Sequence, residues 1–244
     1  MAETGHVKNV ENLGKARDFA TSWGAAYQPS NPNLAIAAMT ALIASAEGGI
    51  DGVQTQKTPY RNATAACEDA FEPLSKLTTR VMKSLKASGV PESVSDDAET
   101  YSRKIQGRRK TEAKEDDPST PDVDESDASH SASQMSRSQR IENLQNLRML
   151  LEAQALYAPN EVDLQTNTIK DLENDLTAKT QAVGTTFVAF SNSMADRDDV
   201  LYLNDENVVA TGRLFKTYVE AAFSRNSTEW NQVKDLEFRD LRRI

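Results

Sequence analysis

The chain has 244 residues, of which 38% are hydrophobic and 27% are charged, a balance typical of one large or two small soluble domains. No run approaches the roughly 20 consecutive apolar residues that a membrane crossing needs. Residues 1–11 lack the basic and then apolar order of a secretory signal, so we expect a cytoplasmic protein. One cysteine, Cys67, excludes an internal disulfide, and with only His6 and His130 the common zinc sites cannot be assembled.

The net charge of −9 is unevenly distributed along the chain. Residues 1–110 carry 14 basic and 12 acidic side chains, residues 111–139 carry 2 and 8, and residues 140–244 carry 12 and 17. The middle segment has no aromatic residue and only Val123 and Met135 as sizeable apolar residues, so burial cannot offset the entropy lost when it becomes ordered. We predict an acidic linker over 111–139 that contains Ser and Pro, is disordered, and acts as a solvated spacer.

The two segments that flank this linker match each other at a nearly constant shift, which predicts an internal repeat. At shifts of 129 to 133 residues, the pairs include Tyr27 with Tyr157, Pro29 with Pro159, Leu34 with Leu164, Asn62 with Asn192, Arg80 with Arg213, Lys83 with Lys216 and Tyr101 with Trp230. Small drifts in the shift are what loop insertions leave in a duplicated unit. We therefore predict two copies of one unit, at 1–110 and 140–244.

Within each copy, apolar residues recur every three or four positions, which indicates helices rather than strands. Breaks between helices are predicted at Pro73, Ser88–Pro91, Asn204–Asp205 and Ser224–Ser227. The segments between breaks give about four helices per copy, and short connections make consecutive helices antiparallel neighbours. The predicted fold class is all-α, with two tandem antiparallel bundles of about four helices joined by the acidic linker.

The pattern also makes local predictions that a structure can check. Asn31 and Asn160 are placed to cap the helices that follow them, with side-chain oxygens that accept backbone N–H groups. The glycines in Gly48–Gly52 are predicted to bend the long helix of the first copy, because glycine weakens a helix interior. In the matching helix of the second copy, Leu176 is predicted to be buried and Glu173 to face outward.

Three segments carry a resemblance to known sequences. Tyr27–Pro32, its counterpart Tyr157–Asn160, and the basic run Arg103–Arg109 at the end of the first copy are similar to a group of uncharacterised bacterial proteins with an internal helical repeat. The resemblance covers nearly the whole chain. It implies a helical repeat fold, and it implies no activity, ligand or catalytic residue.

The sequence contains no group of residues with the spacing of a catalytic, cofactor or metal site. A Ser/His/Asp or Cys/His nucleophile needs a histidine base, and both histidines lie in segments predicted to be loose. Cys67 precedes the acidic pair Glu68–Asp69, which disfavours a thiolate, and it is predicted to pack inside a helix. The acidic groups at 68–72 and 196–199 are predicted to be solvated helix faces rather than metal ligands. The acidic residues at 96–99 are predicted to lie near the start of a helix, where the positive end of the helix dipole favours them. We therefore predict a protein that is not an enzyme and that has no catalytic, cofactor-binding or metal residues.

Two further segments bear on the partners of this protein. Five of the eight residues in Arg103–Lys110 are basic, but the acidic segment directly after them would compete with any nucleic acid, which we therefore exclude as a partner. The apolar stretch Leu34–Ile50 is predicted to pack in a core rather than enter a membrane, because its counterpart Leu164–Thr180 is heavily charged.

We predict a non-enzymatic helical protein with a structural or interaction function, and we expect it to associate with itself. Its partner would be another protein, and a second copy bound head to tail is the simplest case, with the basic run meeting an acidic surface. Two alternatives remain open at this point. One is a helical module that binds a ligand or a peptide, and the other is a delivered effector that acts at a membrane.

Overall fold

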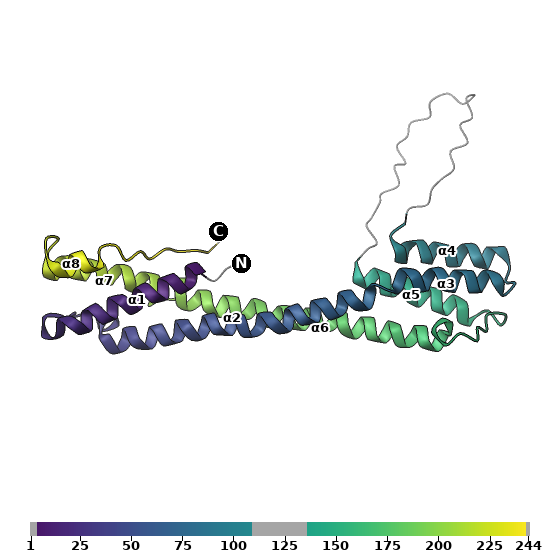
Figure 1. Ribbon diagram of the computed structural model, residues 1–244, viewed down its shortest axis with the longest axis horizontal. Coiled ribbons are helices and arrows are strands. Elements are labelled where there is room, and N and C mark those ends of the chain that lie inside the picture. The colour runs from purple at the N-terminus through teal and green to yellow at the C-terminus, as the bar shows by residue number, and fades with distance from the viewer. Residues whose placement is uncertain (1–3, 109–135, 243–244) are drawn as a thin grey trace, which may run out of the picture. The chain divides into compact units, whose positions relative to one another are not determined.

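The computed structural model describes residues 4–108 and 136–242, and these are helical apart from short connections and an extended C-terminal segment (Figure 1). The α-helices are α1 (Thr4–Trp23), α2 (Ile36–Phe71), α3 (Leu74–Ala87), α4 (Glu92–Gln106), α5 (Arg137–Glu152), α6 (Thr166–Asp198), α7 (Val208–Phe223) and α8 (Thr228–Val233). Short 3₁₀ turns η1 (Gly24–Ala26), η2 (Pro32–Leu34) and η3 (Val162–Leu164) and a π turn η4 (Asp199–Leu203) lie between them. Since the described part of the chain contains no strand, the all-α prediction is confirmed.

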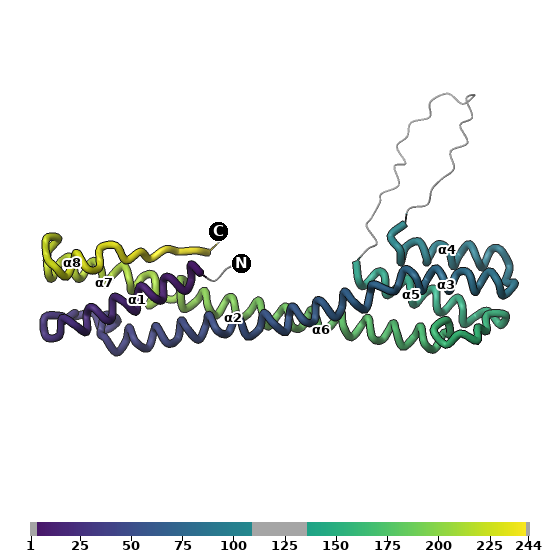
Figure 2. Tube along the Cα trace, in the orientation of Figure 1, coloured from purple at the N-terminus to yellow at the C-terminus, as the bar shows by residue number. Residues whose placement is uncertain are grey.

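The chain forms two compact units, and each is built from both halves of the sequence. Unit 1 comprises Met1–Arg61 with Thr185–Ile244, and unit 2 comprises Asn62–Gly184. In unit 1, helix α1 packs on α7 and α8, and η2 packs on α7. In unit 2, helix α4 packs on α3 and α5. Figure 2 shows the consequence for unit 1, where purple N-terminal and yellow C-terminal segments run side by side.

This division differs from the predicted boundaries. The sequence predicts one bundle at 1–110 and another at 140–244, whereas the compact units exchange segments between those halves. The physical reason is the length of α2 and α6, which have 36 and 33 residues. At 1.5 Å per residue, α2 extends about 54 Å, nearly twice the length of the 20-residue α1. Helices of ordinary length cannot cover such a helix, so its two parts belong to different units.

Each unit has its own apolar core, and neither core draws a buried residue from the other unit. Fully buried members of the unit 1 core include Leu13, Met39, Leu201 and Phe215. Those of the unit 2 core include Leu74, Leu85, Leu144, Leu147, Leu151, Ile169 and Leu176. The predicted burial of Leu176 is confirmed, but Glu173 is only 7% exposed, and its predicted outward orientation is wrong.

The joint after the first helix of each half has the same local structure. The Tyr27 hydroxyl donates a hydrogen bond of 2.7 Å to the Leu34 carbonyl, and the Tyr157 hydroxyl donates one of 2.8 Å to the Leu164 carbonyl. Both tyrosines are 7% exposed, and burial raises the pKa of each phenol. Each hydrogen bond closes the loop that leads into the long helix.

Aromatic side chains surround this joint in unit 1. Trp23 stacks on Phe215 with ring centres 6.1 Å apart and 9° between the planes, and Tyr27 meets Tyr218 edge to face at 5.3 Å. Such pairs add about 0.5–1.5 kcal/mol beyond the area that they bury. They connect the end of α1 to α7, which are helices from opposite ends of the sequence.

The predicted helix breaks are found where backbone chemistry requires them. Pro73 lies between α2 and α3, and the segments at 88–91, 204–207 and 224–227 separate the later helices. Asn31 caps η2 through a hydrogen bond from the Asn33 N–H, as predicted, but Asn160 caps no helix, because η3 begins after Glu161 and has no side-chain cap.

The glycines of α2 do not interrupt it, since the helix is continuous from Ile36 to Phe71. A Cβ atom at Gly49 would lie 3.3 Å from the Cα atom of Arg197 on α6. Gly49 therefore permits the close approach of two helices, which is the role of glycine here instead of the predicted bend. The proline inside α2, Pro59, lies at an exposed position of the same helix.

Most of the predicted linker, residues 111–135, lies outside the described residues. Its last part differs from the prediction, because α5 begins at Arg137 rather than near 140. Ser136 starts that helix by accepting a hydrogen bond from the Gln139 N–H. This N-cap satisfies one of the N–H groups that a helix start leaves unpaired.

Candidate functional site

The chemistry-bearing residues singled out in the sequence are dispersed in the structure. Cys67 is fully buried in α2, with its Sγ atom 3.8 Å from the Thr180 hydroxyl. The Nδ1 atom of His6 lies 2.7 Å from the Tyr202 hydroxyl, and His130 lies outside the described residues. Within the described residues, no group of three His, Cys, Asp or Glu side chains has the geometry of a metal site.

One residue of each acidic group noted in the sequence forms an ion pair with a cation. Glu68 lies 3.8 Å from Arg137, Glu99 lies 3.3 Å from Lys86, and Asp198 lies 2.7 Å from Arg197. The first two pairs join different helices of unit 2. Because exposed ion pairs contribute only about 0 to 1 kcal/mol each, these contacts orient side chains more than they stabilise the fold.

Unit 2 presents a basic hollow between α3 and α4, which we call the basic surface and define by Lys83, Lys86, Arg103 and Arg108. Met82 and Ser102, both nearly buried, line the same hollow. Its one carboxylate, Glu99, is paired with Lys86. The hollow is held in shape by Gln106, whose side-chain amide donates hydrogen bonds to the Ser75 carbonyl and the Thr79 hydroxyl.

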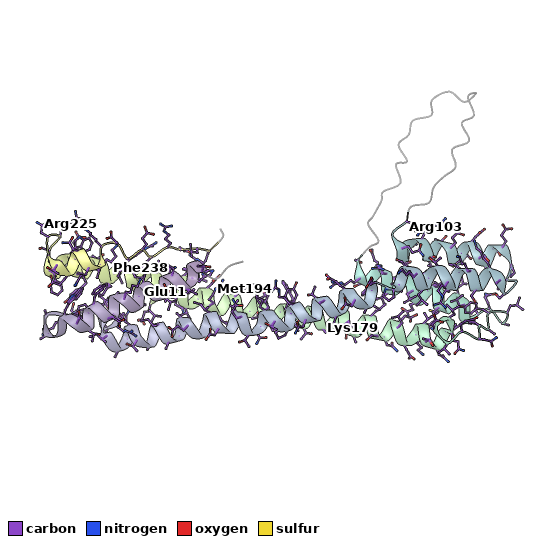
Figure 3. The ribbon with its side chains drawn as sticks, in the orientation of Figure 1. Glu11, Arg103, Lys179, Met194, Arg225 and Phe238 are labelled. Carbon is purple, nitrogen blue, oxygen red and sulfur yellow. The ribbon has the colours of Figure 1, made fainter. Side chains whose placement is uncertain are left out.

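Arg103 and Arg108 on this surface belong to the basic run that the sequence identifies. Figure 3 labels Arg103 on α4. Gly107 ends α4 in the left-handed conformation at φ 67°, and the Arg108 N–H donates to the Arg103 carbonyl. Arg109 and Lys110 lie outside the described residues. Lys83 and Lys86, which complete the surface, come from α3, and only the packing of α3 on α4 reveals them as part of it.

Unit 1 has a hollow of opposite charge between α2 and the turn after α6. Leu42, Ser45 and Val200 line it together with the exposed loop at Asn204, Asp205 and Glu206. Asp199, which precedes this loop in the sequence, is also exposed. Leu203 lies between Asp199 and Asp205 in the sequence and is 54% exposed. We call Asp199, Asp205 and Glu206 the acidic surface.

A buried ion pair in unit 2 has no signal in the sequence pattern. The Nε atom of Arg148 on α5 lies 2.9 Å and 3.1 Å from the two carboxylate oxygens of Glu173 on α6, and its Nη1 atom lies 2.7 Å from Glu152. Burial raises the pKa of Glu173, and the guanidinium of Arg148 opposes that rise. The pair is buried and each charge faces an opposite one, so it fits a structural role.

One helical stretch of the described chain is long and apolar enough to cross a membrane, and it lies within Ile36–Ala87. Mostly buried core helices of soluble proteins pass the same test; here 28% of the apolar stretch is buried, with Met39, Ile43 and Ala46 in the unit 1 core. This feature is weak evidence for a membrane role.

Comparison with known proteins yields no match to a protein-family model, a curated protein or a solved structure. The similarity to bacterial helical-repeat proteins therefore stays a prediction.

Proposed function

We propose that this chain is a non-enzymatic helical interaction protein that associates head to tail with further copies of itself. The observation that carries the proposal is the basic surface of unit 2, where four cations surround one paired carboxylate in a chain of net charge −9. A cationic hollow on an acidic protein favours an acidic partner, and every copy carries the acidic surface of unit 1.

In this contact, charged residues would set orientation and apolar residues would supply affinity. Ion pairs that stay exposed contribute about 0 to 1 kcal/mol each, so the four cations mainly set orientation and the rate of encounter. Affinity has to come from apolar burial, and fully burying a leucine contributes about 1.5 to 3 kcal/mol. Leu203, 54% exposed within the acidic loop, is the side chain that the acidic surface offers for this purpose.

A contact between two different surfaces of identical chains does not close on itself in the way a symmetric dimer does. Each bound pair leaves one basic and one acidic surface free, so the association propagates into chains or rings. The average mass should therefore rise continuously with protein concentration. Added salt should slow growth more than it lowers the final mass, because screening acts on the charged encounter.

Light scattering across a concentration series tests this proposal with one variant and one matched control. The variant replaces the four cations of the basic surface with serine. The control replaces four exposed cations of unit 1, Lys8, Lys15, Arg61 and Arg225, and so removes the same charge. We expect the parent and the control to grow in mass and the variant to stay monomeric. A parent that is monomeric at every concentration contradicts the proposal.

We further propose that the two halves of the chain are copies of one ancestral unit. The support is the matched order of elements, in which α1, η2, α2, α3 and α4 parallel α5, η3, α6, α7 and α8. The equivalent hydrogen bonds of Tyr27 and Tyr157 add to it. On this proposal, two copies of the ancestral unit formed an antiparallel dimer in which each compact unit contained segments of both copies. After duplication the same arrangement forms within one chain.

A further inference from the structure

The last described residues of the chain, Lys234–Arg242, form a turn at Lys234 and Asp235 and then an extended segment that lies against α1 and α7 of unit 1 (Figure 1). It follows α8 and runs toward the start of α1, so that Glu237 lies near Asn12 and Leu241 near Gly5. We call this the tail, and we call the surface that holds it, lined by α1 and α7, the tail groove.

The tail groove binds the main chain of the tail on both sides. On α1, Asn12 donates its side-chain amide to the Glu237 carbonyl at 2.8 Å, and Asn9 donates to the Arg239 carbonyl at 2.7 Å. The Arg239 N–H in turn donates to the Asn9 side-chain oxygen at 3.1 Å. Asn9 and Asn12 are almost fully buried, and these bonds account for their burial.

The other side of the tail is bound by cations of α7. Lys216 donates from Nζ to the carbonyls of Lys234 and Leu236, at 2.6 Å and 3.0 Å, and Arg213 donates to the Phe238 carbonyl at 3.1 Å. The odd-numbered carbonyls therefore bind α1 and the even-numbered ones bind α7. Successive carbonyls of an extended chain point in opposite directions, so this alternation is the recognition of an extended backbone by two helices.

Two apolar side chains of the tail are anchored in the same groove. Phe238 is 7% exposed and lies against Gly212, where an added Cβ would come within 2.4 Å of the ring (Figure 3). Leu236 is 9% exposed and belongs to the unit 1 core. The groove thus recognises an extended backbone with apolar residues at two alternate positions.

The corresponding place in unit 2 is filled differently. There helix α4 packs on α5, and the Arg140 side chain of α5 donates to the Ile105 carbonyl at the end of α4 at 3.0 Å. Helix α4 has 15 residues, whereas α8 has six and then gives way to the extended tail. Unit 1 alone, of the two units described, binds an extended segment in this way.

We infer that the tail groove is a peptide-binding site that accepts the tail of a second copy once its own tail is weakened or displaced. The main-chain hydrogen bonds act on any extended backbone, and each copy supplies a segment with the fitting apolar pair. The tail is joined to the rest of unit 1 only after α8, so it can leave one groove and enter another without unfolding α1 or α7. Exchange of an identical segment preserves every contact, which makes it a low-cost route to association. This site is separate from the basic and acidic surfaces.

The inference is tested with two full-length variants, both made in the chain that carries serine at the four basic-surface positions, so that charge-driven association is absent. Phe238→Ala keeps the groove but weakens the tail. Gly212→Val keeps the tail but fills the space that the Phe238 ring occupies in the groove. Sedimentation velocity of each variant alone should show monomers, and an equimolar mixture should show a 1:1 heterodimer. A mixture that stays monomeric overturns exchange between copies.

A synthetic peptide of residues 234–242 with a fluorescent label gives a second readout. We expect it to bind Phe238→Ala at least tenfold more tightly than the parent, whose own tail competes, and to bind Gly212→Val no more than the parent. The same peptide with alanine at position 238 is the control and should not bind. Equal binding to all three proteins overturns the site. If circular dichroism shows that Phe238→Ala is unfolded, Leu241→Ser, at a position 39% exposed, replaces it.

Discussion

Arg148→Met should destabilise unit 2 far more than Glu173→Gln, although the two substitutions break the same ion pair. Removing Arg148 leaves a carboxylate that is 7% exposed without its cation, and breaking a buried pair in this way typically costs about 3 to 5 kcal/mol. Glu173→Gln leaves Arg148 bound to Glu152 at 2.7 Å, so the cost should be that of one charged hydrogen bond, about 1.5 to 3 kcal/mol.

The same reasoning predicts how pH acts on the weaker variant. Burial already raises the pKa of Glu173, and losing the Arg148 guanidinium removes the group that opposes this rise. Because the folded carboxyl then holds its proton more firmly than the unfolded one, the stability of Arg148→Met should increase as pH falls from 7 toward the unfolded pKa of 4.5. The double variant Arg148→Met with Glu173→Ile, which introduces the residue found at the matching position Ile43, should recover most of the loss.

Urea unfolding followed by far-ultraviolet circular dichroism at pH 7 and pH 5 measures all four proteins. The order of stability we expect at pH 7 is parent, then Glu173→Gln and the double variant, then Arg148→Met. Equal losses for the two single variants, or an Arg148→Met variant whose stability relative to the parent does not change with pH, would refute the account of this pair.

Three other predictions concern the helices and their joints. Leu176→Ala should lower the unfolding free energy by about 2 to 5 kcal/mol, since Leu176 is fully buried, and an unchanged melting temperature would contradict its place in the core. Pro59→Ala should raise it by about 1 to 3 kcal/mol, because an exposed proline inside α2 removes a helix hydrogen bond, and equilibrium unfolding measures the gain. Burial raises the pKa of Tyr157 and Tyr202 from 10.0 to about 12, so stability should fall as pH rises from 10 to 12; an alkaline absorbance titration should show both phenols ionising late.

Local features of this fold could be predicted from the sequence because their causes are local. Pro73 cannot continue a helix, and Asn31 caps the turn that follows it, so both act within a few residues. The burial of Leu176 could be predicted from the spacing of apolar residues at every third or fourth position within its own helix. In each case the residue and the structure that it determines are neighbours in the chain.

The partners of the helices could not be predicted in the same way. Periodicity shows that a helix has an apolar face and does not show which other helix covers it, so the exchange of segments between the halves left no signal. Glu173 has the same spacing as a surface residue, and only Arg148, on a different helix, explains its burial. The tail after α8 is held by Asn9 and Asn12, which lie more than 200 residues earlier in the chain, so no local pattern indicates its position.

The claim that two surfaces of opposite charge bring copies together is tested most directly by mixing two complementary variants. One carries serine at the four positions of the basic surface, and the other carries Asp199→Asn, Asp205→Asn and Glu206→Gln. Each retains one surface of the pair, so sedimentation velocity should show each alone as a monomer and the equimolar mixture as a 1:1 heterodimer that grows no further. A mixture no heavier than its components, or a basic-surface variant that still assembles as the parent does, would contradict head-to-tail association.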